Sequence, residues 1–297
     1  MRDVFLFATL VLIWGSTFAA IPFQLGVVAV EWSVAYRFGI AAVALALYAV
    51  LSGRSLLLPR ASLPFVFLQG ILLFSLNYFL VYYASAYITT GLIAVLFSLI
   101  ILSNAGFERL FFNTRIDARF VVAAALGVTG IACVFWPEVS ELSFEDTAIL
   151  GIALTMGSVL SASLGNMTAT LNTRRQLPVV ALNTYAMGFA TVFSSVVALV
   201  LGRPLGFSLD VGYVLSLAYL SVFGSAVAFG CYLALIRSIG PSRAAYSSVL
   251  FPIVALFLST LIEDYEWTTI AAVGVALALL GNYVLLSKPR KTKEDGQ

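Results

Sequence analysis

Long runs of apolar residues, separated by short polar and charged stretches, make up almost the whole chain. A helix needs roughly 20 apolar residues to cross a bilayer core of about 30 Å. Ten stretches meet this requirement: residues 5–23, 34–51, 63–83, 90–107, 120–136, 148–171, 179–201, 211–236, 244–262 and 267–286. The runs are continuous, whereas strands of a membrane barrel would alternate polar and apolar residues. The pattern therefore predicts an all-α polytopic membrane protein with ten transmembrane helices.

The composition supports this prediction. Of the 297 residues, 61% are hydrophobic and only 10% are charged, and the mean hydropathy is +1.03. Soluble domains carry about 25% charged residues, so soluble enzymes and nucleic-acid-binding proteins are excluded. The first apolar stretch also has features of a signal peptide, but its length and the internal Pro22 favour a first transmembrane helix.

The charged residues of the connections predict the orientation. If the N-terminus is cytoplasmic, all of the 16 Lys and Arg residues except Arg37 and Arg203 lie on the cytoplasmic side. The opposite side then holds acidic residues, namely Glu138, Glu141, Glu145, Asp146, Glu263, Asp264 and Glu266. Because Lys and Arg are enriched in cytoplasmic loops, both termini are predicted to be cytoplasmic.

The two halves of the sequence match each other at nearly constant spacing. The matches are Gly15-Ser16 with Gly157-Ser158, Tyr36 and Gly53-Arg54 with Tyr185 and Gly202-Arg203, Ser75 and Tyr82 with Ser225 and Tyr232, residues 95–97 with residues 249–251, and Gly130 with Gly281. We predict a first repeat at residues 1–137, a second at residues 147–287, and a basic cytoplasmic tail at residues 288–297. An odd number of spans in each repeat inverts the second copy in the membrane, which is typical of alternating-access carriers with a site near the midplane.

Several short segments also resemble a known family. They are Trp14-Gly15-Ser16-Thr17-Phe18, Arg37, residues 90–98 (TGLIAVLFS) and residues 240–246 (GPSRAAY). These segments resemble the EamA branch of the drug/metabolite transporter superfamily, and the resemblance extends over essentially the whole chain as two EamA repeats. It implies ten helices, a bacterial inner-membrane location and export of small molecules. Within the branch, the chain is most similar to bacterial exporters associated with aromatic amino acids.

Arg37 is the only charged residue inside a predicted span. Charged groups in hydrocarbon are costly and usually face a cavity or a partner. Arg37 therefore either contacts substrate or a gate, or it snorkels outward or pairs with Glu31 in a structural role.

Polar and aromatic residues at other mid-span positions complete the candidate site. The predicted substrate-binding set is Trp14, Ser16, Arg37, Asn77, Tyr78, Tyr82, Ser98, Ser158, Ser161, Ser225, Phe229 and Ser248, and the predicted hinges are Gly15, Pro22 and Pro252. Small and hydroxyl side chains also mediate helix packing in membranes, so each of these residues has a structural alternative. Tyr83 and Tyr87 are interpreted as part of an interfacial aromatic belt.

The residue types that are missing narrow the function. The chain has no His, its first Lys is Lys288, and no Asp or Glu lies in a predicted span. No metal or cofactor is therefore predicted, an intramembrane enzyme is disfavoured, and a side-chain proton relay is not expected. We predict a monomeric exporter of aromatic and other neutral amino acids and related small metabolites, working by facilitated diffusion in contact with the lipid bilayer. The alternatives are an exporter of other metabolites or drugs with the same fold, a channel, or a scaffold.

Overall fold

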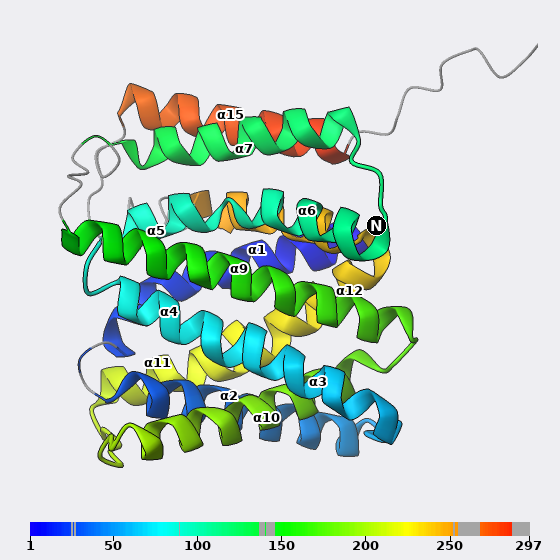
Figure 1. Ribbon diagram of the computed structural model, residues 1–297, viewed down its shortest axis with the longest axis vertical. Coiled ribbons are helices and arrows are strands. Elements are labelled where there is room, and N and C mark those ends of the chain that lie inside the picture. The colour runs from blue at the N-terminus through cyan, green and yellow to red at the C-terminus, as the bar shows by residue number, and fades with distance from the viewer. Residues whose placement is uncertain are drawn as a thin grey trace, which may run out of the picture.

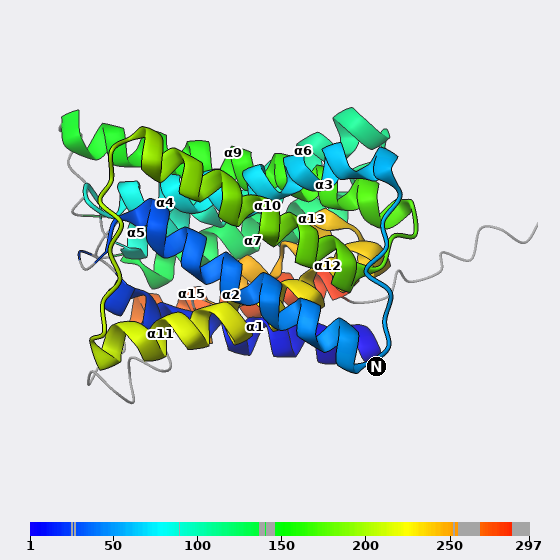
Figure 2. The same cartoon turned by 90° about the horizontal axis from the view of Figure 1, so that it is seen from below.

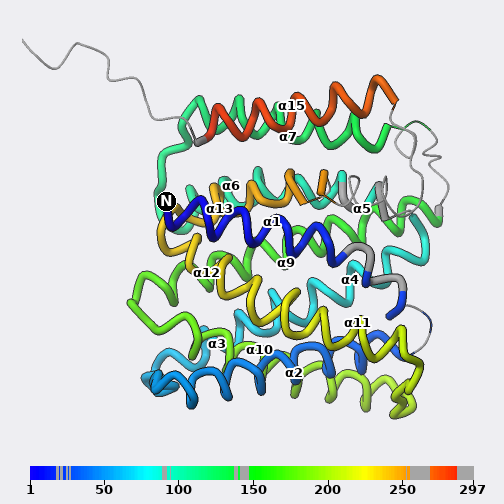
Figure 3. The backbone as a smooth tube through the Cα atoms, turned by 180° about the vertical axis from the view of Figure 1, so that it is seen from behind, coloured from blue at the N-terminus to red at the C-terminus, as the bar shows by residue number. Residues whose placement is uncertain are grey.

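A computed structural model describes residues 1–24, 26, 28–88, 90–136, 140, 146–251, 253–254 and 268–286. Figure 1 shows a stack of helices that run side by side between two ends of the molecule. We call the end at which α1 begins the near end, and the opposite end, at which α2 begins, the far end. Figure 3 shows the same two ends from behind.

The first part of the chain, up to residue 136, crosses between the two ends repeatedly. Its helices are α1 (Arg2–Ala20), η1 (Ile21–Gln24), α2 (Val30–Leu51), η2 (Arg60–Ser62), α3 (Leu63–Gln69), η3 (Gly70–Leu76), α4 (Asn77–Ala84), α5 (Thr90–Phe97), α6 (Ile100–Phe112) and α7 (Ala118–Val134). The segments α3, η3 and α4 follow one another without a break and form one crossing.

The later part also crosses between the two ends repeatedly. Its described helices are α9 (Asp146–Arg174), α10 (Val179–Val200), α11 (Val211–Ser221), η4 (Val222–Val227), α12 (Ala228–Ile239), α13 (Pro241–Ala244) and α15 (Thr269–Leu286). Here α11, η4 and α12 are continuous and again form one crossing.

The all-helical, polytopic prediction is confirmed. Within the described residues no strand occurs, and six helices are long and apolar enough to cross a membrane. Two shorter apolar helices are Ala118–Val134 and Thr269–Leu285. The count of ten spans stays a prediction, because Pro252 and residues 255–262 of the stretch at residues 244–262 lie outside the described residues, as do residues 287–297.

Two segments of π-helix were not predicted. The segment η3 (Gly70–Leu76) interrupts the crossing in the first half, and η4 (Val222–Val227) interrupts the crossing in the second half. Each contains one of the two serines, Ser75 and Ser225, that the sequence repeat pairs with each other. Because π-helical turns are rare and concentrate at functional sites, their matched positions support the repeat.

Two pairs of helices pack closely against each other, α2 with α10 and α7 with α15. Figure 2 shows α2 running beside α10, and in Figures 1 and 3 α7 runs beside α15 at one edge. A β-carbon on Gly130 would lie 2.6 Å from the carbonyl oxygen of Gly274, so the backbones of α7 and α15 touch where neither residue has a side chain. Small residues allow this close approach between membrane helices.

The ends of α2 and α10 have the same corner geometry. Gly53 and Gly202 take positive φ angles of 64° and 63°, which glycine adopts without strain. The next amide nitrogens, of Arg54 and Arg203, donate to carbonyls five residues back at 2.8 and 2.9 Å. The sequence match between Gly53-Arg54 and Gly202-Arg203 therefore corresponds to a matched local structure.

Candidate functional site

An aromatic cluster joins the two halves of the chain in the middle of the helix stack. The ring of Trp14 on α1 lies 5.1 Å from that of Phe229 and 5.2 Å from that of Tyr232, both on α12. Phe74 of η3 packs against Phe229 at 4.7 Å and against Phe38 of α2 at 5.2 Å. Trp14 and Phe229 were predicted to contact substrate, and the structure brings them together. Phe38, Phe74 and Tyr232 were missed.

Arg37 borders this cluster and is only 4% exposed. Its Nε donates a 2.9 Å hydrogen bond to the Ser225 hydroxyl, and its guanidinium lies 4.8 Å from the ring centroid of Tyr78. Its Nη1 is buried and has no hydrogen-bond partner among the described residues. The structural alternative, pairing with Glu31, is wrong because Glu31 bonds other groups. A buried cationic donor without a partner is costly, so this nitrogen is suited to an anionic ligand atom.

The π-helical segment η4, which carries Ser225, makes further contacts beside Arg37. The Trp14 indole nitrogen donates to the carbonyl oxygen of Gly224 at 3.1 Å. A β-carbon on Gly224 would lie 2.9 Å from Thr17 Cγ2 and 3.4 Å from Arg37 Nη2. Glycine at this position thus lets α1, α2 and η4 meet beside the guanidinium.

Tyr82 belongs to the same region. It is buried on α4, close enough to Arg37 for the guanidinium to act electrostatically on its hydroxyl. Six of the predicted residues therefore form one connected group: Trp14, Arg37, Tyr78, Tyr82, Ser225 and Phe229.

Other predicted residues lie at contacts between helices. Ser158 on α9 donates to the amide oxygen of Asn77 at 2.6 Å. Ser161, one turn later, donates to the carbonyl oxygen of Leu72 at 2.8 Å. These bonds hold α9 against η3 and α4, which is the structural alternative considered for both serines.

Three further serines do not reach the aromatic cluster through a hydrogen bond. Ser16 bonds the hydroxyl of Tyr219 at 2.6 Å, and Ser98 donates to the carbonyl oxygen of Val95 at 2.6 Å. Ser248 is buried, and its hydroxyl has no partner among the described residues.

Of the predicted hinges, Gly15 lies at a tight contact. A β-carbon there would lie 2.5 Å from Val254 Cβ and 3.0 Å from the carbonyl oxygen of Phe251. Pro22 lies in η1 (Ile21–Gln24), and Pro252 lies outside the described residues. The role of these residues as hinges stays a prediction.

Comparison with known proteins identifies the family. The model of the EamA-like transporter family matches residues 1–136 and 149–287. The chain belongs to this family of transporters. The resemblance noted in the sequence is thereby confirmed, and the two matched segments are separated near the predicted repeat boundary.

Several known proteins are similar to this EamA-like transporter over two thirds or more of their length. The chain is 28% identical to the uncharacterized inner membrane transporter YedA of Escherichia coli K12, over 94% of this chain and 91% of that protein. It is 22% identical to protein PagO of Salmonella typhimurium, covering 95% and 91%. It is also 24% identical to a probable amino-acid metabolite efflux pump of Escherichia coli K12, covering 66% and 69%.

One solved structure has the same fold. A protein known from its crystal structure superposes with a TM-score of 0.80 at 16% identity, and the match covers 96% of both chains. The fold of the EamA-like transporter is therefore one that has been observed experimentally.

Two carboxylates lie inside helices of this transporter, which corrects the prediction that no span holds one. Glu31 lies in the first turn of α2, and Glu108 in the last turn of α6. Both are buried, at 1% and 9% exposed. The prediction of uncoupled transport was based partly on the absence of carboxylates from the spans. It now depends on which groups Glu31 and Glu108 bind.

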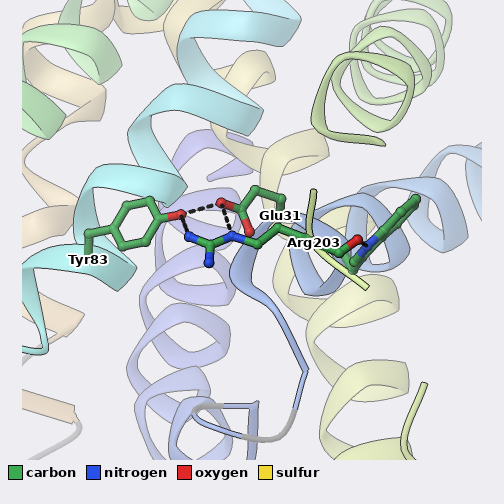
Figure 4. A network of polar contacts seen from close by, with 4 residues as sticks. Glu31, Tyr83 and Arg203 are labelled. Carbon is green, nitrogen blue, oxygen red and sulfur yellow. Dashed lines mark hydrogen bonds and ion pairs between the residues drawn. The ribbon is translucent and has the colours of Figure 1, made fainter. Parts of the chain in front are cut away.

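Glu31 is held at the far end by two partners (Figure 4). The Tyr83 hydroxyl donates to its Oε1, and Arg203 Nε lies 3.6 Å from the same oxygen. Arg203 also donates to the Tyr83 hydroxyl at 3.5 Å. The hydroxyl and the carboxylate raise the pKa of Arg203 above its ordinary value. Tyr83 was interpreted as an interfacial residue, whereas the structure gives it this specific polar contact.

Glu108 is held at the near end. Its Oε2 accepts hydrogen bonds from the Ser242 hydroxyl and, at 3.2 Å, from the Ser242 backbone nitrogen. One turn earlier, the amide oxygen of Asn104 accepts from the Ser163 hydroxyl at 2.6 Å. Glu108 therefore caps the start of α13, within the segment GPSRAAY that resembles the family.

A separate cavity of about 410 Å³ opens at the near end between α1, α10 and α12. It is lined by Arg2, Val179, Ala234, Arg237 and Ser238. None of the predicted site residues lines it. In the part of the chain that the structure describes, no group of His, Cys, Asp and Glu is arranged to hold a metal ion.

Proposed function

We propose that this EamA-like transporter exports aromatic and other neutral amino acids and related small metabolites across the bacterial inner membrane. The observation that carries the proposal is the unpartnered Nη1 of buried Arg37 beside the aromatic cluster of Trp14, Phe74 and Phe229. A cationic donor and an aromatic surface side by side match a ligand with a carboxylate and an apolar body.

The binding mode follows from the chemistry of these groups. The substrate carboxylate accepts from Arg37 Nη1, which forms the charge-assisted hydrogen bond that the empty protein lacks. The substrate side chain packs against Trp14 and Phe229, where aromatic pairs favour edge-to-face contact. The hydroxyls of Tyr78 and Tyr82 are the nearest candidates to accept from the α-amino group.

The mechanism proposed is alternating access between two inverted five-helix repeats, residues 1–137 and 147–287. The matched π-helical segments and the matched corners after α2 and α10 support the repeat. The distribution of Lys and Arg supports cytoplasmic termini, which makes the near end cytoplasmic and the far end external.

Transport is proposed to proceed without an ion gradient. In the described part of the chain, the side chains beside the Arg37 guanidinium include Ser225, Phe38, Tyr78 and Tyr82, and none of these four is a carboxylate. Glu31 and Glu108 are bound by partners at opposite ends of the molecule.

We also propose that the transporter is a monomer, because the small residues Gly130 and Gly274 pack against each other within one chain.

Ligand-dependent thermal stabilisation of the purified transporter tests the proposed site. A ligand at about 100 times its Kd stabilises the folded state by about 2.7 kcal/mol. We expect phenylalanine to raise the melting temperature more than phenethylamine, which lacks the carboxylate. The Arg37→Gln variant should bind both compounds equally weakly. Equal stabilisation of the parent protein by both compounds would contradict a carboxylate contact.

A further inference from the structure

The far end of the molecule is joined by one network that spans both halves of the chain. Glu31 lies on α2 and Tyr83 on α4, and Arg203 follows α10, so the network connects the end of α4 to the α2–α10 pair (Figure 4). The Trp32 indole also donates to the backbone carbonyl of Arg203 at 3.3 Å, which fixes the corner that carries the arginine.

At the near end, the corner formed by Gly53 and Arg54 has the same backbone geometry, but its arginine makes different contacts. Arg54 occupies the position after Gly53 that Arg203 occupies after Gly202, with the same backbone hydrogen bond. Its guanidinium instead lies 5.6 Å from the ring centroid of Tyr48 on α2, the helix that ends just before Arg54. The spacing that pairs Tyr36 with Tyr185 pairs Glu31 with Val180, so the near-end corner lacks the carboxylate.

The helix that carries Tyr83 begins directly after a π-helical segment. Within that segment, Gly70 is in backbone contact with Ala186 of α10, and Ser75 donates to the carbonyl oxygen of Ala190 at 3.2 Å. Beyond it, α4 packs mainly on α9. The π-helical segment is therefore fixed on α10, and the helix that follows it is tied to Glu31 of α2 and to Arg203 at its tip.

We propose that Glu31, Tyr83 and Arg203 form a lock that keeps the far end closed and must break before substrate leaves through that end. The inference rests on the alternating access of the proposed function. It assigns the closing contact to these three residues, and it assigns no equivalent lock to the near-end corner.

The different burial of Glu31 and Arg203 explains how their contact can form and break. Glu31 is 1% exposed, whereas the Arg203 side chain is 45% exposed. A buried carboxylate is tolerated only while it is paired, and removing the partner leaves an uncompensated charge. Without Arg203, the carboxylate gains hydration when the far end opens, so the open arrangement becomes favoured.

Distances between spin labels in lipid vesicles test the lock directly. Labels are attached to cysteines replacing Ala86, after α4, and Leu205, after Arg203, both of which are exposed. The native Cys133 and Cys231 are first replaced by alanine. The distance distribution is measured without substrate in the parent and in Arg203→Gln, Glu31→Gln, Tyr83→Phe and the matched control Arg54→Gln.

We expect Arg203→Gln to shift the Ala86–Leu205 distances to longer values, and Arg54→Gln to leave them unchanged. Adding Glu31→Gln to Arg203→Gln should reduce the shift, because no unpaired charge then remains buried. Should Arg203→Gln fail to fold, Tyr83→Phe gives a smaller shift in the same direction. An unchanged distribution in the folded lock variants, or an equal shift in Arg54→Gln, would overturn the proposal. Because no substrate is added, the result does not depend on which cargo the transporter carries.

Discussion

The indole nitrogen of Trp14 donates a hydrogen bond to the backbone carbonyl of Gly224, which lies 210 residues further along the chain. This bond joins the first helix to the π-helical segment of the second half, directly beside Arg37. In the proposed alternating access, a contact between the two halves at the candidate site changes when the halves move against each other. The strength of this hydrogen bond would therefore contribute to the free-energy difference between the proposed conformations of the transporter.

The first prediction concerns this bond. Trp14→Phe keeps an aromatic ring against Phe229 but removes the donor to Gly224. We expect a loss of about 1 kcal/mol from the stability of the state described here, measured by thermal unfolding in detergent. The matched control is Trp136→Phe, because Trp136 is 47% exposed. Equal melting temperatures for the two variants would contradict a structural role for the Trp14 bond.

The second prediction concerns the charge of Arg37. Arg37→Gln removes the guanidinium from beside Tyr78 and Ser225, and a hydrogen bond to a charged group is worth about 1.5–3 kcal/mol. We expect at least about a tenfold loss of affinity for phenylalanine, with little change for phenethylamine, in a binding titration. Arg54→Gln serves as the control and should bind as the parent does. If Arg37→Gln binds phenylalanine normally, the carboxylate lies elsewhere.

The third prediction concerns the tight contact between the third crossing and α10. Gly70→Ala would place a methyl group against the carbonyl oxygen of Ala186, whereas Gly188→Ala meets nothing within 4 Å. Overpacking of this kind costs about 1–3 kcal/mol. We expect a clear fall in the melting temperature for Gly70→Ala and none for Gly188→Ala. Similar behaviour of the two variants would contradict the close approach of the two backbones.

The fourth prediction concerns the near-end carboxylate. Glu108→Ala removes both the acceptor and the charge that cap α13 at Ser242, so it should destabilise the transporter by about 1–3 kcal/mol. Glu108→Gln keeps an acceptor and should cost less. Thermal unfolding measures the order of the two losses. A greater loss for Glu108→Gln than for Glu108→Ala would show that the contact with Ser242 does not stabilise the fold.

The helices were predictable because each one is a continuous apolar run. The run at residues 179–201 corresponds to α10 (Val179–Val200), and the run at residues 211–236 to the crossing that ends at Ile239. The π-helical segments were not predictable, since Gly70–Leu76 has the same apolar composition as its flanking turns. A π-helix depends on which carbonyls the amides reach, and hydropathy carries no information about that choice.

The candidate site was predictable only in part. Arg37 stood out because a charged residue in an apolar run is rare, and Trp14 because tryptophan is uncommon at mid-span. Phe74 did not stand out, because a phenylalanine in an apolar run carries no signal of its own. The pairing of Glu31 with Arg203 joins residues far apart in sequence, so the nearer Arg37 was considered as the partner of Glu31.

Counterflow in proteoliposomes tests the central claim most directly. Vesicles containing the purified transporter are loaded with unlabelled phenylalanine, and uptake of labelled phenylalanine is followed with and without an imposed proton gradient. We predict saturable counterflow of phenylalanine that is the same with and without the proton gradient. Alanine should also support counterflow. The Arg37→Gln variant should show no counterflow, whereas the Arg54→Gln variant should retain it. The absence of counterflow for every amino acid tested, from protein shown to be folded, would contradict this prediction.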